Sequence, residues 1–305
     1  MRIARLFALF TFLLSACSAA SPGADAPLHV LATTDIIADV VQQVGGEQIA
    51  LETLIPSGSD PHAFSPAPRD AVRISQADIL FLNGLGLEAS LQPVLENLPP
   101  DALRVELAQG IAPLQMDADP HADAHDSPEG AADPHIWTDP NNVRAWLPLI
   151  VEALSQRDPA HAALYRQRAD AYAAQLDALD AWIREQVASI PQERRILVSD
   201  HLVWGYFGER YGFSQQAALI PGFSTLTQPS ARDLAALEDN LRKTGVPVIF
   251  VGNTVNPALA ERVAADTGVQ LVTLYTGSLG PAEDGADTYL GWMRYNVRAI
   301  VHALR

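Results

Sequence analysis

One long helical segment constrains the fold more than any other feature of this 305-residue chain. It begins at Asp158-Pro159, a helix cap followed by proline at the first helical position, and runs to about Ser189 without an internal glycine or proline. Apolar and aromatic residues three or four positions apart form one buried stripe along it: Tyr165, Ala169, Tyr172, Leu176, Leu179, Ile183 and Val187. At 1.5 Å per residue this helix would be roughly 45 Å long. Because that is longer than one small domain is wide, we expect the helix to join two domains.

Short apolar runs alternate with helical patterns on both sides of this segment, and such alternation favours parallel βα units. Before the segment, we expect strands at 28–33, 49–54 and 79–83 and helices at 35–44 and 141–156. After it, we expect strands at 196–199, 248–251 and 270–274 and helices at 203–211, from Ser230, at 257–267 and at 286–304. The sequence therefore predicts an α/β fold with two lobes, each a mostly parallel sheet flanked by helices, joined by one long rigid helix.

The expected domain boundaries follow from this division. The first α/β lobe would take residues 28–157, the linking helix 158–190 and the second α/β lobe 191–305. Residues 18–27 are small and polar, which is typical of a flexible tether.

The first 17 residues have the pattern of an export signal. Arg2 and Arg5 precede the apolar run 6–14, which is too short to span a bilayer and ends at Leu14-Ser15-Ala16-Cys17. Cys17 is the only cysteine, so no internal disulfide can form, and its position resembles the lipobox of bacterial lipoproteins, in which this thiol is acylated after cleavage. We expect an extracytoplasmic lipoprotein held at a membrane through lipid on Cys17, either in the periplasm or on the outer face of the cell membrane.

The charge balance of the chain is acidic, with 36 Asp and Glu against 20 Lys and Arg and a formal net charge of −16. Nucleic acid is not an expected partner, because an acidic surface repels a polyanion. The same surface raises the local concentration of cations.

Three histidine motifs carry the clearest functional signal. Two copies of Asp-Pro-His, each with an aromatic residue two positions later, are Asp60-Pro61-His62-Ala63-Phe64 and Asp133-Pro134-His135-Ile136-Trp137, and the third motif is Ser199-Asp200-His201. Imidazole suits Zn, Cu, Ni and Fe, and the fixed φ of proline can hold each ring in place before an ion arrives. One such histidine alone would more often be an ordinary turn residue. Three together indicate a metal site in the crevice at the carboxyl ends of the strands, where open α/β sheets bind ligands.

At these motifs the chain resembles the metal-binding substrate-binding lipoproteins of bacterial zinc and manganese ABC importers. The resemblance runs over essentially the whole mature chain, from His29 to Asn296, and includes Leu274-Tyr275-Thr276-Gly277-Ser278-Leu279-Gly280. It implies two lobes joined by one long helix, a divalent metal in the cleft between them, and delivery of that metal to an importer permease and its ATPase. It implies no enzymatic activity, and we expect a monomer.

The resemblance carries the metal ligands over to His62, His135 and His201. Glutamate at the third position would favour the harder manganese, so His201 indicates Zn2+ first and Mn2+ second. The usual fourth ligand in the family is an aspartate in the C-terminal motif, where this chain has Gly277. Asp284, Glu283 and water are the candidates for that place. We expect water, because Gly277 creates space where the carboxylate would otherwise stand.

A Gly-, Pro- and Asp-rich stretch between Met116 and Asp133 contains His121 and His125. Its composition is typical of a mobile loop, and we expect His121 and His125 to form an accessory, low-affinity metal-collecting loop, which would resemble the longer His-rich loops of zinc-binding relatives. The alternative is a solvated insertion in which the two histidines occur by chance.

Two other functions stay open. Three histidines with an open water position would permit a metal-dependent hydrolase. Against this function, the sequence contains no His-Glu-x-x-His motif and no identifiable general base. Some members of the family are described as surface adhesins, and a role in cell adhesion would require a partner-facing surface that the sequence does not reveal.

Overall fold

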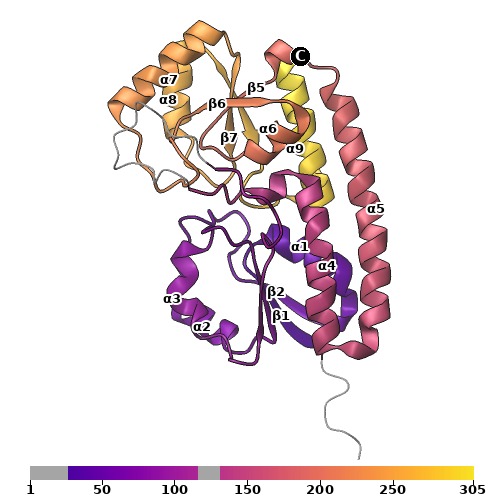
Figure 1. Ribbon diagram of the computed structural model, residues 1–305. Coiled ribbons are helices and arrows are strands. Elements are labelled where there is room, and N and C mark those ends of the chain that lie inside the picture. Colours follow the sequence, from indigo (N-terminus) through magenta and orange to yellow (C-terminus); the bar gives the residue numbers. More distant parts are fainter. Residues whose placement is uncertain (1–26, 116–130) are drawn as a thin grey trace, which may run out of the picture.

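The computed structural model describes residues 27–115 and 131–305, which form two lobes stacked along one long helix (Figure 1). The expected lipidation site Cys17 and the loop residues His121 and His125 lie outside the described residues. Among the described residues, no helix is both long enough and apolar enough to cross a membrane.

The first lobe is built on a parallel sheet of four strands. β1 (Leu28–Ala32) lies between β2 (Ile49–Thr53) and β3 (Ile79–Leu82), and β4 (Leu103–Glu106) pairs with β3 at the edge. β3 is apolar and buried at every position, as expected for an inner strand of a parallel sheet that is covered on both faces.

Helices cover both faces of this sheet, because alternate side chains of a strand point to opposite sides. One set of side chains from β1 and β3 packs in a common core with α1 (Asp35–Gly45) and α4 (Pro140–Arg157). The other set packs against the short helices α2 (Pro68–Ile74) and α3 (Gln92–Leu95).

The second lobe repeats this arrangement. β5 (Ile196–Ser199) lies between β6 (Ser214–Ala218) and β7 (Val248–Gly252), and β8 (Gln270–Leu274) pairs with β7 at the edge. All pairs are parallel, and the relative order of the strands is the same as in the first sheet.

The helices of the second lobe are α6 (Gly205–Tyr211), α7 (Ala231–Thr244), α8 (Ala258–Thr267) and α9 (Tyr289–Leu304). A capping box begins α7, because Ser230 and Asp233 bond to each other's backbone N–H. The last helix begins at Tyr289 and not at Ala286. Thr288 provides its cap, and Gly285, with a left-handed φ of 62°, turns the chain just before it.

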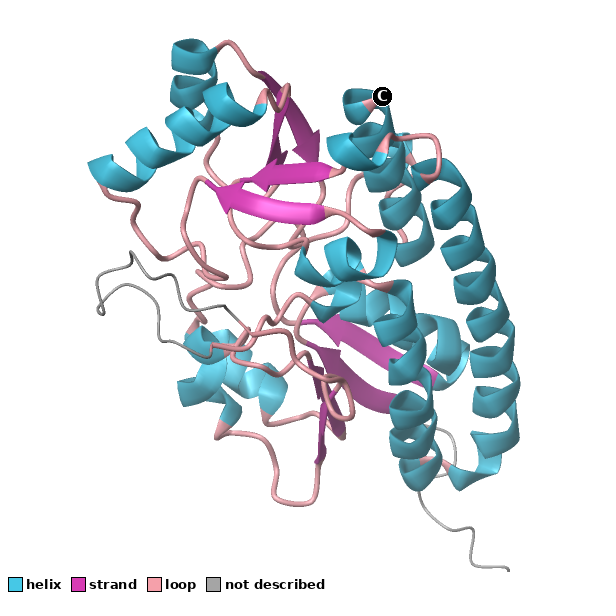
Figure 2. Ribbon diagram, turned by 45° about the horizontal axis from the view of Figure 1, so that its top comes forward, coloured by secondary structure: helices cyan, strands magenta, loops and turns pink. Residues whose placement is uncertain are grey.

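The long helix α5 (Ala162–Val187) runs along both lobes (Figures 1 and 2). It packs against α1 and α4 of the first lobe and α9 of the second. Its seven expected stripe residues are all buried, none more than 6% exposed, so the two-lobed α/β fold with one long helix is confirmed. The regular helix starts later than expected, because Pro159–His161 form a 3-10 turn and the Asp158 carboxylate accepts hydrogen bonds from His161 and Tyr165 side chains.

Four short elements, α2, α3, β4 and β6, were not expected from the sequence. β6 reads Ser-Gln-Gln-Ala-Ala and lacks the β-branched and aromatic residues that favour strands. β4 lies at a sheet edge with every residue at least partly exposed. Their neighbours in the sheets, and not their own composition, determine these strands.

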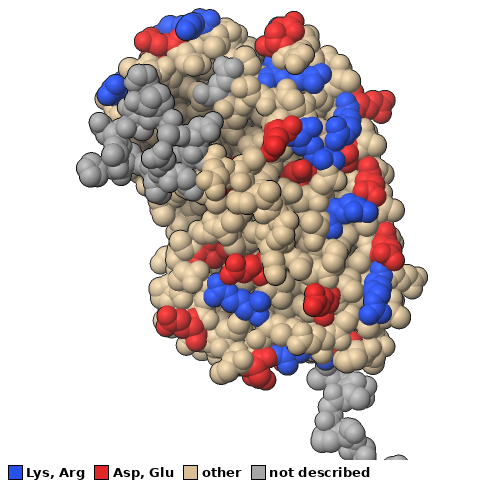
Figure 3. All heavy atoms as spheres, in the orientation of Figure 1, with Lys and Arg blue, Asp and Glu red and all other residues tan. Residues whose placement is uncertain are grey.

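On the face shown in Figure 3, basic and acidic side chains lie beside one another. The described residues form ion pairs such as Arg144–Asp177 at 2.9 Å and Arg184–Asp180 at 3.1 Å. Because at least one partner in each pair is about half exposed, these pairs contribute little to stability.

Leu179→Ala should lower the free energy of unfolding by about 2–5 kcal/mol, because the substitution leaves a cavity in the buried stripe of α5. Gln175→Ala, at an exposed position of the same helix, should change it by less than about 0.5 kcal/mol. Urea unfolding of both variants measures the difference. Equal losses of unfolding free energy in the two variants would contradict the conclusion that the buried stripe holds α5 in place.

Candidate metal centre

The three predicted histidines converge in the cleft between the lobes. His62 lies in the loop after β2, His135 directly precedes a 3-10 turn that leads into α4, and His201 follows β5. Their side chains are buried, with exposed fractions of 8%, 1% and 3%. Among the described residues, their ligand atoms form one group, all within 4.8 Å of one another.

The same local interaction fixes the backbone of each histidine. An aspartate one or two residues earlier accepts a hydrogen bond from the backbone N–H of the histidine: Asp60 for His62 at 2.9 Å, Asp133 for His135 at 2.9 Å and Asp200 for His201 at 2.7 Å. Aspartate side chains favour such local bonds, which close a tight turn. In the two Asp-Pro-His motifs proline has no N–H, so the N–H of the histidine is the first donor available.

Two of these aspartates also orient the imidazole rings. Asp133 Oδ1 lies 2.7 Å from His135 Nδ1, and Asp200 Oδ1 lies 2.6 Å from His201 Nδ1. A carboxylate partner keeps the proton on Nδ1 and leaves the lone pair of Nε2 free for a metal. The second oxygen of Asp200 accepts a hydrogen bond from the backbone N–H of Gly252. The second oxygen of Asp133 is buried without a partner among the described residues.

The Nε2 atoms face one another across a short gap. His135 Nε2 lies 3.1 Å from His62 Nε2 and 3.3 Å from His201 Nε2. Two nitrogen ligands of a tetrahedral zinc ion, each about 2.05 Å from the metal, are about 3.3 Å apart. Both of these distances suit a single tetrahedral ion, and the ligand atoms of His62 and His201 lie within 4.8 Å of each other.

Burial keeps two of these imidazoles, those of His62 and His135, neutral. It lowers the pKa of both well below the usual 6.5, and the neighbouring His201 lowers both further. Burial also raises the pKa of Asp133 to about 7, although the hydrogen bond from the His135 backbone opposes that shift. The metal-free site thus presents His62 and His135 in the deprotonated form that a metal requires.

Beside the three Nε2 atoms the histidines line a cavity of about 10 Å³, roughly the room that one water molecule needs. The other lining residues are Asp60, Pro61, Trp137, Val203, Thr254 and Gly277. A Cβ placed on Gly277 would lie 2.8 Å from Pro61 Cδ and 3.1 Å from Thr254 Oγ1. The expectation of open space beside Gly277 is therefore wrong, because Pro61 and Thr254 already border that place closely.

Asp284 and Glu283 do not belong to the ligand group of the described residues. Both lie in a 3-10 turn (Ala282–Asp284) and are exposed. The carboxylate of Asp284 instead accepts a hydrogen bond from the Tyr275 hydroxyl. The fourth ligand stays a prediction.

A hollow of about 280 Å³ adjoins His62, and its walls come from both lobes. Leu85 and Leu87 line it from the first lobe, and Phe223 and Leu226 from the second. Leu226 is 61% exposed, so this hollow gives the histidines a largely apolar border toward solvent.

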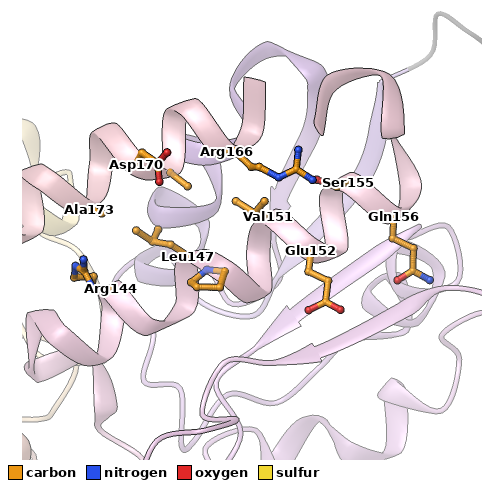
Figure 4. Close-up of a pocket in the computed structure, with 11 residues that line it drawn as sticks. Arg144, Leu147, Val151, Glu152, Ser155, Gln156, Arg166, Asp170 and Ala173 are labelled. Atoms are coloured by element: carbon orange, nitrogen blue, oxygen red, sulfur yellow. The ribbon is translucent and has the colours of Figure 1, made fainter. Parts of the chain in front are cut away.

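A larger hollow of about 700 Å³ lies between α4 and α5 (Figure 4). Its lining combines apolar residues such as Leu147 and Val151 with charged residues such as Arg144 and Asp170. The three histidines are not among its lining residues, so it is separate from the candidate metal centre.

The motifs point to the histidines but not to every residue that shapes the site. The sequence could have indicated that Asp133 and Asp200 belong to the site. Asp200 directly precedes His201, and Asp133 lies two residues before His135. The sequence gives no such indication for Thr254. This residue lines the cavity only because β7 and β8 lie side by side in the folded sheet.

Comparisons with known proteins agree on one family. The family model described as "Zinc-uptake complex component A periplasmic" matches residues 30–303. The manganese-binding lipoprotein MntA of Halalkalibacterium halodurans is 32% identical over 278 residues, covering 91% of this chain and 88% of that protein. The iron-binding protein YfeA of Yersinia pestis is 31% identical over 306 residues, with coverages of 98% and 95%. The solved structure of the periplasmic zinc binding protein TroA from Treponema pallidum matches with a TM-score of 0.81 at 30% identity, covering 92% of this chain and 99% of that one.

Metal binding should release a proton from Asp133 near neutral pH. With its pKa raised to about 7, Asp133 carries a proton below that pH in the metal-free protein. A divalent ion on His135 favours the ionised carboxylate and lowers this pKa, so the proton leaves as the metal binds. Zinc affinity should therefore rise with pH up to about 7 and then level off.

Calorimetric titrations at about pH 6, in buffers of different ionisation enthalpy, measure this proton release. In Asp133→Asn this proton release should be absent. The variant should also bind zinc about 10–100-fold more weakly, because an amide orients His135 less firmly. Binding heats of the wild type that are independent of the buffer would contradict the assignment.

Proposed function

This chain belongs to the family described as "Zinc-uptake complex component A periplasmic", and from that premise we propose that it captures a zinc ion between its lobes for import into the cell. His62, His135 and His201 would hold the ion until it passes to the permease of an ABC importer, whose ATPase drives uptake. The observation that carries this proposal is the convergence of three buried imidazole side chains on one point.

The set of donor atoms favours zinc over manganese. The three grouped ligands all offer imidazole nitrogen, which suits zinc, whereas manganese prefers carboxylate and water oxygens. The nearby carboxylates of Asp133 and Asp200 bond to the Nδ1 side of the rings. They therefore lie on the side opposite the Nε2 atoms that face the metal position. Relatives are named for manganese, iron or zinc, so family membership supports a divalent metal without selecting one. Manganese is the second candidate.

An extracytoplasmic location fits this function. MntA is named a lipoprotein, and the sequence of the present chain predicts an export signal that ends at Cys17. We propose that lipid on Cys17 holds the protein at the membrane, in the periplasm or on the outer face of the cell membrane. Tethering keeps the protein near the permease and raises its effective concentration there.

A hydrolytic function is not favoured by the site. A catalytic zinc needs a nearby general base in addition to an open position. The two buried carboxylates beside the histidines already bond to imidazole Nδ1 atoms. The relatives are named for metal binding, and the family is described as a component of a zinc-uptake complex.

Protein isolated from its native host without added metal should contain about one zinc ion per chain, because three imidazole ligands favour zinc. Elemental analysis measures the content, and competition titrations of the metal-free protein compare zinc with manganese. Manganese or iron in place of zinc would contradict the choice of metal but not the transport function. A chain that binds none of these metals would contradict both.

His62→Ala, His135→Ala and His201→Ala should each weaken zinc binding by at least about 100-fold, because each removes one ligand of a small set. His302→Ala is the matched control, since His302 is exposed on α9. Chelator competition measures all four affinities. A histidine whose loss leaves zinc affinity at the wild-type value is not a ligand.

A further inference from the structure

The loops after three neighbouring strands meet at the metal site. They follow β5, β7 and β8, and they contribute His201, Thr254 and Gly277 to one small cavity. Thr254 lies two residues beyond the end of β7. Its position is at the carboxyl edge of a parallel sheet, where α/β proteins bind ligands.

Thr254 borders the place that a side chain at position 277 would occupy. A Cβ on Gly277 would lie 3.1 Å from Thr254 Oγ1. A longer side chain at position 277 would begin beside this hydroxyl. Because glycine stands there, a neutral oxygen and not a carboxylate borders this side of the cavity.

The other polar groups in the lining are already engaged. Asp60 accepts hydrogen bonds from the His62 backbone and the Thr225 hydroxyl. The indole N–H of Trp137 donates to the Thr276 carbonyl at 3.0 Å. Within the described parts of the chain, the Thr254 hydroxyl forms no hydrogen bond to another protein group. Among the side-chain oxygens of the lining, it is therefore the one that has no protein partner in the described residues.

We propose that the Thr254 hydroxyl positions the water molecule that completes the coordination of the metal. This inference rests on the proposed function, because it requires an ion on the three histidines. The hydroxyl accepts a hydrogen bond from the bound water and so fixes the water as the fourth ligand. Thr254 is a positioning residue and does not contact the ion itself.

The consequence is a metal site with three neutral nitrogens and one neutral oxygen. Such a set keeps the preference for zinc, because it lacks the carboxylate that stabilises harder ions such as manganese. Thr254 thus acts with Gly277 as a determinant of metal specificity in this chain.

Thr254→Val tests the proposal, because valine keeps the shape of threonine and removes the hydroxyl. Zinc affinity should fall by about 10–100-fold, the usual effect of losing a group that supports a metal ligand. Thr254→Ser retains the hydroxyl and should bind zinc within about 3-fold of the wild type. Thr273→Val, at an exposed position of β8, is the control for the substitution itself.

Cobalt(II) provides a second readout, because its visible absorption reports the number and symmetry of the ligands. The cobalt-loaded wild type and Thr254→Ser should give matching spectra, and Thr254→Val should give an altered one. Thermal unfolding of the metal-free variants checks that each is folded, and Thr254→Ala replaces Thr254→Val if the latter is not.

Wild-type zinc affinity together with an unchanged cobalt spectrum in Thr254→Val would overturn the role of Thr254 and leave the proposed function intact. A wild-type protein that binds neither zinc nor cobalt would overturn the proposed function itself. Reduced affinity in both Thr254→Val and Thr254→Ser would also overturn the proposal, because it would show that packing, and not the hydroxyl, matters at this position.

Discussion

The packing of α5 on both lobes is the constraint on which the metal site depends. By contacting α1 and α4 on one side and α9 on the other, α5 holds two parallel sheets with their carboxyl ends toward the same cleft. The loops at those ends can then bring together histidines that lie 73 and 66 residues apart in the sequence. No single lobe contains the whole site, since His62 and His135 belong to the first lobe and His201 to the second.

Buried charge explains why this cleft suits a cation. Asp133 and Asp200 are at most 2% exposed, and each lies within hydrogen-bond distance of an imidazole Nδ1. A buried carboxylate without a compensating charge is costly, which is why burial raises the pKa of Asp133. A divalent ion bound to the far side of the two rings supplies the missing positive charge. Metal binding therefore also stabilises the folded protein.

The sequence predicts those parts of the molecule in which local pattern and burial agree. The stripe on α5 and the strands 196–199 and 270–274 are examples, since periodicity and apolar composition indicate the same element. β6 could not be predicted, because its polar residues form a strand only by pairing with β5. The histidine motifs predict the ligand group. The role proposed for Thr254 depends on contact between loops that follow different strands, and the spacing of residues in the sequence cannot predict such a contact.

Contacts between the lobes determine how such a site can release its metal. The Asp35 carboxylate in α1 accepts hydrogen bonds from the Ser278 hydroxyl at 2.6 Å and from the Leu279 N–H at 3.2 Å. These bonds attach the loop that carries Gly277 to the first lobe, and α5 spans both lobes, so a wide hinge opening would have to break many contacts. We expect small tilts instead. Small tilts suffice, because metal–nitrogen bonds tolerate changes of only about 0.2 Å. A slight displacement of His201 with the second lobe would remove one of three ligands while His62 and His135 stay in place.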